Sequence, residues 1–142
     1  MTPFYNDDFI EQSVSKTMLI HEEITQEIIR CFFHVYNYFG YGFSEKVYEN
    51  ALCIELAKAG LVVNAQEKID VFYEQEIVGT YYADLLVDNK VIVELKSTGY
   101  LKLEHEAQLL NYLKATNIEV GLLLNFGEKA EFKRKAFANI NK

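Results

Sequence analysis

The stretch ADLLVDNKVIVELKS, residues 83–97, is typical of two β-strands joined by a short turn. Its apolar residues are mostly Leu, Val and Ile, and the Asp-Asn pair in the middle favours a turn. Three charged residues, Asp84, Glu94 and Lys96, interrupt this apolar sequence. Successive strand residues point to opposite faces, so Glu94 and Lys96 share one face, while Val91, Val93 and Leu95 point to the other. An isolated buried charge is costly, so these three residues require a partner or a metal ion.

The length of the turn determines whether Asp84 meets Glu94. A two-residue turn would place Asp84 opposite a residue that points to the wrong face of the sheet. A three-residue turn at 88–90 instead pairs Val87 with Val91 and Asp84 with Glu94. Paired positions hold their Cβ atoms about 4.5–5.5 Å apart. We therefore expect the three-residue turn and two adjacent carboxylates.

Two carboxylates at that separation repel each other unless a cation lies between them. Their oxygen atoms suit Mg²⁺ or Mn²⁺, with water as the remaining ligands. Beside such a metal, Lys96 would orient or deprotonate an attacking water, or stabilise charge on a phosphate. This pattern predicts metal-assisted hydrolysis of a phosphodiester. The alternative is a structural ion pair between Lys96 and either Asp84 or Glu94.

Helical and strand periodicities alternate along the rest of the chain, and no linker or repeat divides it. The expected elements are helices at 18–39 and 43–59, strands at 61–72, 76–87 and 90–97, a helix at 103–116, a strand at 119–126 and a helix at 129–139. This α-α-β-β-β-α-β-α order predicts an α/β fold with a mixed central sheet and helices on both faces. We expect one domain over residues 1–142, with 1–17 a loosely ordered N-terminal extension.

Two helices offer further polar groups to the site. Glu45 and Tyr48 share a face of the second helix, where Glu45 lies in the first turn and would reach the metal directly or through water. His105, Gln108 and Tyr112 share a face of the helix after the second charged strand. Gln108 and Tyr112 would bind a phosphate or position Lys96. The alternatives are a surface acid at Glu45 and a polar edge on a packing helix.

The net charge of −7 and the presence of only two arginines argue against strong, non-specific binding to duplex nucleic acid. The densest basic stretch is EKAEFKRKAF, residues 128–137, for which a solvated helix face is the simpler interpretation than a phosphate-contacting strip. Tyr81 and Tyr82 would stack on bases or pack in the sheet.

Nothing in the sequence predicts a membrane or secreted protein. It contains no apolar segment of 18 residues, and its acidic N-terminus lacks a basic region followed by an apolar one. Cys31 and Cys53 lie in apolar helical patterns without metal-type spacing, as expected of buried free thiols in a reducing cytoplasm. We therefore expect a cytoplasmic location.

The segment GFSEKVYENAL, residues 42–52, resembles the signature of the GxxExxY protein family, with Gly42, Glu45 and Tyr48 in the naming positions. Residues 83–97, together with HEAQLLNYLKAT at 105–116 and GLLLNF at 121–126, resemble the rest of that pattern. The resemblance spans about residues 20–137. That family is grouped with the PD-(D/E)XK nuclease superfamily, so the resemblance implies a restriction-endonuclease-like fold.

The resemblance also implies residue roles. Asp84 takes the place of the motif aspartate, Glu94 and Lys96 take the places of the (D/E)XK element, and Glu45 is the acid from the preceding helix. Gln108 and Tyr112 resemble the Q-x-x-x-Y helix of exonuclease-type branches. Ala83 stands where the motif has proline, a substitution that the superfamily tolerates.

The sequence thus predicts a Mg²⁺- or Mn²⁺-dependent nuclease. Asp84, Glu94, the Leu95 carbonyl and Glu45 would hold the metal, Lys96 would act on the attacking water, and Gln108 would orient Lys96 or the substrate. Tyr112, His105 and Tyr48 are weaker candidates for positioning the substrate. The expected partner is nucleic acid, DNA rather than RNA, and a homodimer or a partner protein would supply basic surface. The alternative hypothesis is a non-catalytic module that retains the nuclease fold to bind nucleic acid or protein.

Overall fold

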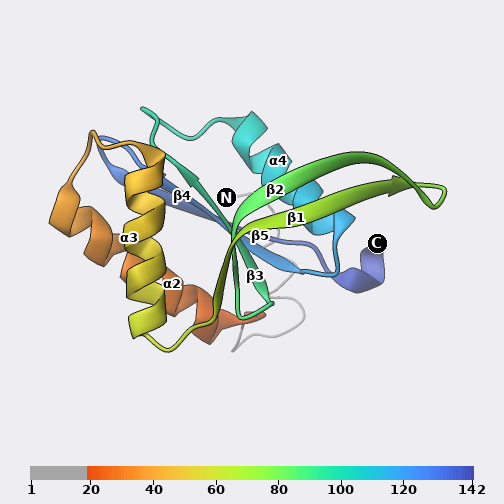
Figure 1. The fold of residues 1–142 in the computed structure, drawn as a ribbon, viewed down its shortest axis with the longest axis horizontal. Coiled ribbons are helices and arrows are strands. Elements are labelled where there is room, and N and C mark those ends of the chain that lie inside the picture. Colours follow the sequence, from red (N-terminus) through yellow and green to blue (C-terminus); the bar gives the residue numbers. More distant parts are fainter. Residues whose placement is uncertain (1–18) are drawn as a thin grey trace.

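The computed structural model describes residues 19–142, and the expected N-terminal extension at 1–17 lies outside the described residues. The elements are α2 (Glu22–Phe39), α3 (Glu45–Lys58), β1 (Val63–Tyr73), β2 (Glu76–Val87), β3 (Val91–Lys96), α4 (Leu103–Ala115), β4 (Val120–Phe126), β5 (Ala130–Ala136) and the short 3₁₀ helix η1 (Asn139–Asn141). Figure 1 shows the central sheet between the helices, with the long β1–β2 hairpin extending to one side.

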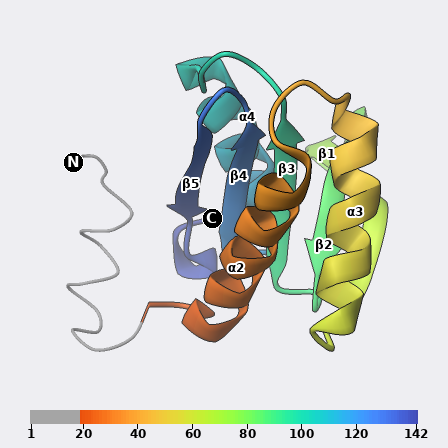
Figure 2. The same ribbon diagram turned by 90° about the vertical axis from the view of Figure 1, so that its left-hand side faces the viewer.

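The five strands form one mixed sheet in the order β1-β2-β3-β4-β5. Strands β3 and β4 are parallel and are connected through α4, whereas the other neighbouring pairs are antiparallel. In Figure 2, α2 and α3 lie on one side of the sheet and α4 lies on the other. The predicted α/β fold, with a mixed sheet and helices on both faces, is confirmed.

Each face of the sheet has its own apolar core. The core against α2 and α3 contains Val91, Val93 and Leu95 of β3, and the core against α4 contains Ile92. The remaining residues of β3, Glu94 and Lys96, alternate with the first set and therefore belong to the face of α4. The predicted division of β3 into two faces is confirmed.

The turn between β2 and β3 has the predicted length. Val87 pairs with Val91, Leu86 with Ile92 and Leu85 with Val93, so residues 88–90 form the loop. Asp88 and Asn89 both adopt positive φ, a conformation that these two residue types tolerate better than most. The Asp88 carboxylate also accepts a hydrogen bond of 2.8 Å from the backbone N–H of Val62, which ties this turn to the start of β1.

The predicted last helix at 129–139 is wrong, because residues 130–136 form the edge strand β5. All seven residues of β4 pair with residues of β5, from Val120 with Ala136 to Phe126 with Ala130. The Ala, Lys, Arg and Glu content of this segment favours a helix locally, but the unpaired edge of the buried strand β4 gains more from a partner strand. Tertiary pairing therefore overrides local propensity here.

This correction also changes the basic stretch at 128–137, because alternate residues of a strand point to opposite faces. Arg134 donates a hydrogen bond to the backbone carbonyl of Ile20, before α2. Lys135 forms an ion pair of 2.9 Å with Glu106 of α4, on the other side of the sheet. The charges of residues 128–137 are thus divided between the two faces of the sheet, so this stretch does not form a single basic strip.

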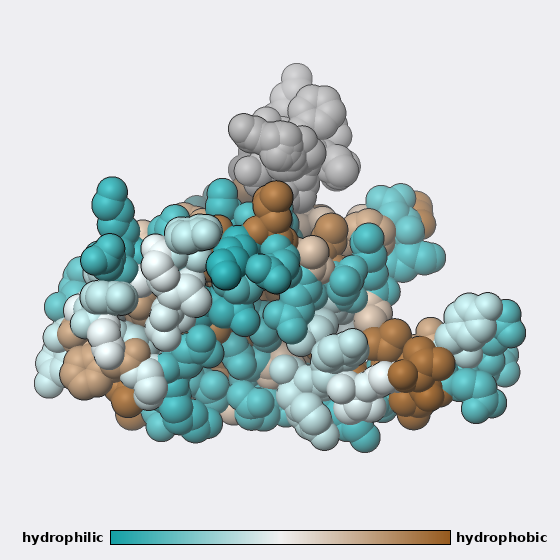
Figure 3. All heavy atoms as spheres, turned by 90° about the horizontal axis from the view of Figure 1, so that it is seen from above, coloured by the Kyte–Doolittle hydropathy of each residue, from teal (hydrophilic) through white to brown (hydrophobic). Residues whose placement is uncertain are grey.

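The β1–β2 hairpin continues well beyond the part of β2 that pairs with β3. Only Leu85–Val87 of β2 pair with β3, whereas the pairing of β1 with β2 extends to Tyr73 and Glu76. Beyond the segment that pairs with β3, the hairpin exposes six large apolar or aromatic side chains: Phe72, Tyr73, Ile77, Val78, Tyr81 and Tyr82. In Figure 3, brown side chains gather near the end of this projecting hairpin, at the right.

Among residues 19–142, no helix has both the length and the apolar character required to cross a bilayer.

Candidate active site

The backbone pairing of β2 with β3 ends one step before Asp84 and Glu94. Beyond that step, the two carboxylates replace the missing backbone contacts. Glu94 Oε2 accepts a hydrogen bond of 2.7 Å from the backbone N–H of Asp84, and Asp84 Oδ2 accepts one of 2.8 Å from the backbone N–H of Leu95. The predicted register therefore brings the two acids together, and it does so through reciprocal bonds from side chain to backbone.

Strand β2 also changes its orientation at Asp84. Ala83 packs into the core against α4, whereas Leu85 packs into the core against α2 and α3, although residues two apart in a regular strand share a face. The opposite position on β1 is Gln66, which adopts a φ of 55° and interrupts the pairing between Ala65 and Glu67. Asp84 thus lies at a one-residue gap in the pairing of β2 with β1 and just beyond the end of the pairing of β2 with β3.

The Glu94 carboxyl is buried, with 5% of the residue exposed. Burial, followed by the negative charge of Asp84, raises the pKa of Glu94 to about 8. Burial also raises the pKa of Asp84, although the hydrogen bond from the Leu95 N–H opposes that shift. Two partly desolvated carboxylates with raised pKa values are the electrostatic pattern of a functional site.

Lys96 lies on the same face as Glu94 but forms no ion pair with either carboxylate in the described part of the chain. Its positive charge still lowers the pKa of both acids, though less than burial raises it. The structure therefore does not support the alternative of a structural ion pair. The half-buried ammonium group of Lys96 is left available for another contact.

The second helix presents a buried acid that the sequence analysis did not select. Glu45 is exposed at the start of α3, whereas Glu49, one turn later, is 7% exposed. Its carboxylate accepts hydrogen bonds from Lys46, at 3.1 Å, and from Gln66 of β1, at 3.3 Å. After burial and the Leu95 bond, Glu49 has the largest effect on the pKa of Asp84, ahead of Glu45. The i, i+4 spacing from Glu45 was the signal that would have identified it.

Helix α4 carries Gln108 and Tyr112 on one face, as a hydrogen-bonded pair. Gln108 Nε2 donates a hydrogen bond of 3.0 Å to the Tyr112 hydroxyl. Burial, followed by the charges of Glu94 and Asp84, raises the pKa of Tyr112 to about 12. His105 lies one turn earlier, where its Nδ1 accepts a hydrogen bond of 3.2 Å from the Lys102 N–H at the start of the helix. Tyr112 is therefore near enough to the acids for their charges to act on it, Gln108 is hydrogen-bonded to Tyr112, and the His105 ring caps α4.

Tyr48 lies away from any surface that a substrate contacts, because its side chain is fully buried. Its ring stacks on Phe126, with centroids 4.2 Å apart. Its hydroxyl donates to the Gly40 carbonyl at 2.5 Å and accepts from the Phe43 N–H at 3.2 Å. Tyr48 thus holds the loop that leads into Glu45 and does not present a group to solvent.

A buried amide supports the other side of the site. Asn125 of β4 is fully buried, and its side chain both accepts from the N–H and donates to the carbonyl of Thr98, each at 3.0 Å. Its Nδ2 also donates to Glu131 of β5 at 3.2 Å. Gly127 adjoins this contact so closely that a Cβ there would lie 2.3 Å from the Thr98 carbonyl. Asn125 therefore fixes the chain two residues after Lys96.

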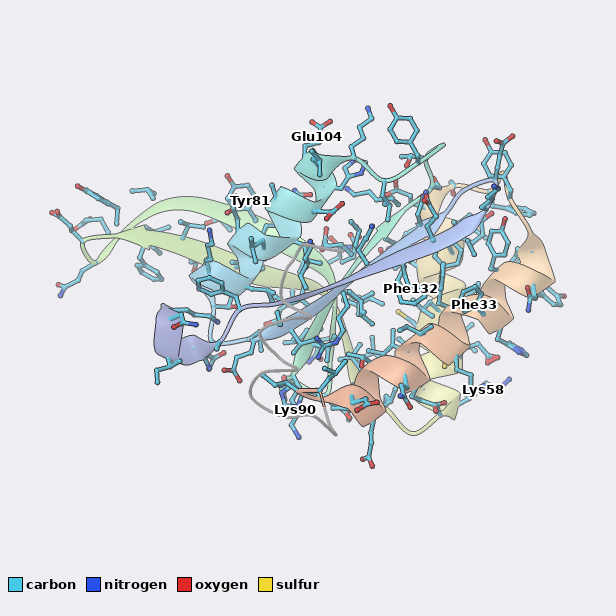
Figure 4. All side chains as sticks on the ribbon, turned by 180° about the vertical axis from the view of Figure 1, so that it is seen from behind. Phe33, Lys58, Tyr81, Lys90, Glu104 and Phe132 are labelled. Carbon is cyan, nitrogen blue, oxygen red and sulfur yellow. The ribbon has the colours of Figure 1, made fainter. Side chains whose placement is uncertain are left out.

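A groove of about 1040 Å³ lies between α4 and the β1–β2 hairpin. Tyr112, Gln108 and His105 line it from the helix, and Tyr81 and Phe72 line it from the hairpin. The Tyr81 and Tyr112 ring centroids are 5.8 Å apart. Figure 4 shows Tyr81 between the hairpin and α4, with Glu104, which also lines the groove, at the start of that helix. The groove therefore includes Tyr112, on which the charges of the two carboxylates act.

The donor set fits a hard divalent cation that keeps several water ligands. Asp84 and Glu94 each use one oxygen for a backbone N–H, and their other oxygens make no hydrogen bond to the described residues. A neighbouring cation would also offset the charge repulsion that contributes to the raised pKa of Glu94. Among residues 19–142, no three His, Cys, Asp or Glu side chains converge as a ready-made metal cage. Two carboxylates with water suit Mg²⁺ in particular.

Comparison with known proteins places this geometry in context. The model of the PD-(D/E)XK nuclease superfamily matches residues 22–135, which include α2 and nearly all of β5. No curated protein matches the chain. Among solved structures, the crystal structure of SSO0001 is similar in fold, with a TM-score of 0.50 and 14% sequence identity over 66% of this chain. The match covers 50% of SSO0001, so the chain spans about half the length of that protein.

Proposed function

Since the chain belongs to the PD-(D/E)XK nuclease superfamily, we propose that it is a divalent-metal-dependent nuclease that hydrolyses phosphodiester bonds at Asp84, Glu94 and Lys96. The observation that carries this proposal is the reciprocal arrangement of Asp84 and Glu94 where the pairing of β2 with β3 ends. Such an arrangement is costly for folding alone, because it desolvates two like charges. A site for a cation and a phosphate accounts for that cost.

Asp84 and Glu94 would hold Mg²⁺ or Mn²⁺ through their unbonded oxygens, with the Leu95 carbonyl as a further oxygen ligand. When bound, the metal supplies Lewis-acid stabilisation of phosphate charge and a more acidic water. Lys96, on the same face and without an ion pair to either acid, would orient the attacking water or contact the phosphate. Gln108, bonded to Tyr112, would position the substrate beside the acids.

Two acids of α3, Glu45 and Glu49, share the role that the sequence predicted for Glu45 alone. Glu45 is exposed and would reach the metal through water. Glu49 is buried, is held by Lys46 and Gln66, and raises the pKa of Asp84 more strongly than Glu45 does. We propose that Glu49 is the acid of this helix that tunes Asp84. We also propose that the chain belongs to the GxxExxY branch of the superfamily and that it prefers DNA to RNA.

The test is a cleavage assay with single-stranded and duplex DNA and RNA, in Mg²⁺, in Mn²⁺ and in chelator. We expect metal-dependent cleavage that falls more than about 100-fold in Glu94→Gln and in Asp84→Asn, since loss of outer-shell partners alone costs about 10–100-fold at metal sites. Glu23→Gln, which removes an exposed acid in the first turn of α2, away from the groove, is the control for charge. Cleavage that persists in both site variants, or in chelator, would refute the proposal.

A non-catalytic binding module is the second candidate, and the charge of the chain favours it. The net charge of −7 opposes the approach of a polyanion, and the predicted basic strip on the last segment is divided between two sheet faces. A homodimer or a basic partner protein would supply the missing positive surface. Nucleic-acid binding without turnover under any metal condition would support this candidate over the nuclease.

A further inference from the structure

The groove between α4 and the β1–β2 hairpin combines two features that suit nucleic acid. The hairpin side presents aromatic rings, with Tyr81 49% exposed and Phe72 60% exposed. The helix side presents Lys102 and Lys114, neither of which forms an ion pair within the described residues. Exposed aromatic side chains stack on unpaired bases, and lysines contact the phosphates between them.

The two lysines lie at opposite ends of α4. Twelve residues separate them in the sequence, which corresponds to about 18 Å along a helix axis, enough for a few nucleotides. The Lys114 Nζ lies over the ring of Phe137, 5.6 Å from the ring centroid, so contact with Phe137 orients the Lys114 side chain. The acidic Glu104 also lines the groove, so the positive charge there is local and small.

The groove includes two helix residues that the proposed function uses, Gln108 and Tyr112. Tyr112 lines the groove, packs 5.8 Å from Tyr81 and is bonded to Gln108. The charges of Glu94 and Asp84 act on the same Tyr112 side chain. A chain that occupied the groove would therefore lie against Tyr112 and Gln108, the residues proposed to position the substrate.

We propose that this groove binds a single strand of nucleic acid and leads it to Asp84 and Glu94. The inference rests on the proposed nuclease function for the chemistry at these two carboxylates. A single strand fits better than a duplex, because duplex binding requires many phosphate contacts and this acidic chain offers two groove lysines. Stacking, in contrast, requires exposed rings and little net charge.

The hairpin offers a matched pair of tyrosines for the test. Tyr81 lines the groove, whereas its neighbour Tyr82 is 55% exposed, is not part of the groove lining, and points to the opposite face of the same strand. Both substitutions to alanine remove one exposed ring from β2. Any difference in oligonucleotide affinity between the two variants therefore reflects the groove and not the hairpin as a whole.

The experiment measures fluorescence anisotropy of labelled oligo(dT) and oligo(rU) of about 12 nucleotides, with the full chain in chelator, so that nothing is cut. We expect Tyr81→Ala to weaken binding about 5- to 100-fold, as expected for the loss of one stacked base. Tyr81→Phe should bind as the wild type does, and Tyr82→Ala should change the affinity less than about twofold.

Equal losses in Tyr81→Ala and Tyr82→Ala, no loss in either, tighter binding of a duplex of the same length, or no binding of either oligonucleotide would overturn the inference. The cleavage assay separates this result from the proposed function. Binding that depends on Tyr81 without any cleavage would leave the groove assigned and refute the nuclease. Cleavage, together with an affinity that is unchanged in Tyr81→Ala, would support the proposed nuclease activity and refute the proposed role of the groove.

Discussion

The two ends of the β2–β3 pair are built in different ways. At the turn end, apolar residues from Leu85 to Val93 pair backbone to backbone and are buried. At the open end, carboxylates and an amide accept the backbone N–H groups of Asp84, Leu95 and Thr98. The turn end is stable because it buries apolar surface, and the open end leaves polar groups beside a groove.

This difference shows how a small sheet creates a site without a large insertion. A buried N–H needs an acceptor, and a side-chain acceptor satisfies it as well as a neighbouring strand does. Because Asp84 and Glu94 each meet that need with one oxygen, the strands separate without leaving unpaired N–H groups. The other oxygen of each carboxylate then remains for a ligand.

The largest expected effect on stability is at the turn end. Ile92 is 1% exposed between the sheet and α4. Ile92→Ala should lower the free energy of unfolding by about 2–5 kcal/mol, through lost burial and the cavity left behind. Urea denaturation measures this change. Ile77→Ala, at a hairpin position that is 56% exposed, is the matched control and should change stability by less than about 0.5 kcal/mol.

At the open end, in contrast, we expect a substitution at Glu94 to raise the free energy of unfolding. Burial raises the pKa of Glu94 to about 8 in the folded, metal-free protein, whereas in the unfolded chain this pKa returns to its ordinary value of about 4.5. Between these values the folded state binds a proton that the unfolded state has released, so stability falls as the pH rises. Glu94→Gln should therefore be more stable than the wild type at pH 8, by roughly 2–4 kcal/mol, and the difference should disappear toward pH 5.

Chemical denaturation in chelator across this pH range measures the effect. Glu23→Gln, which removes an exposed acid in the first turn of α2, is the matched control for the loss of a carboxyl group. Mg²⁺ added at pH 8 should stabilise the wild type and not Glu94→Gln, because only the wild type keeps both carboxylates. A Glu94→Gln variant that is less stable than the wild type at pH 8 would show that this carboxylate supports the fold.

The sequence predicted the turn end better than the open end. Strand periodicity depends on neighbouring residues and was sufficient for the two faces of β3. The requirement that Asp84 lie opposite Glu94 then selected the three-residue turn that pairs Val87 with Val91. The change of face at Asp84 was not predicted, because it depends on the interruption of β1 at Gln66, which is distant in sequence. Strand β5 was mistaken for a helix for the same reason, since its partner β4 decides its conformation.

The site residues show the same division. Asp84, Glu94 and Lys96 stood out as charges in apolar strands, and Gln108 and Tyr112 stood out by helical spacing. Asn125 gave no such signal, because a single amide in an apolar segment does not reveal that it faces the backbone of Thr98. Glu49 was within reach of the sequence, since it lies one turn from Glu45, but its burial became visible only when α3 was packed against the sheet.

Asn125 provides a smaller test of the open end. Asn125→Ala removes three hydrogen bonds and leaves the half-buried backbone of Thr98 without its side-chain partner, which should cost about 1–3 kcal/mol. Because Thr98 follows Lys96 by two residues, cleavage should fall as well, in kcat more than in KM. Asn117→Ala, at an exposed asparagine before β4, is the control. A loss of stability with unchanged kcat would show that Asn125 supports the fold and does not position Lys96.

The smallest expected effect is that of Asp88→Asn, for which the same substitution at Asp84 is the comparison. Asp88→Asn, at the turn, keeps an oxygen that accepts from the Val62 N–H and a residue type that tolerates positive φ. Its free energy of unfolding should stay within about 0.5 kcal/mol of the wild type, and cleavage should be unchanged. Asp84→Asn, four residues away at the open end, should lose cleavage. Similar cleavage in both variants would mean that the open end of this pair is not the site of the chemistry.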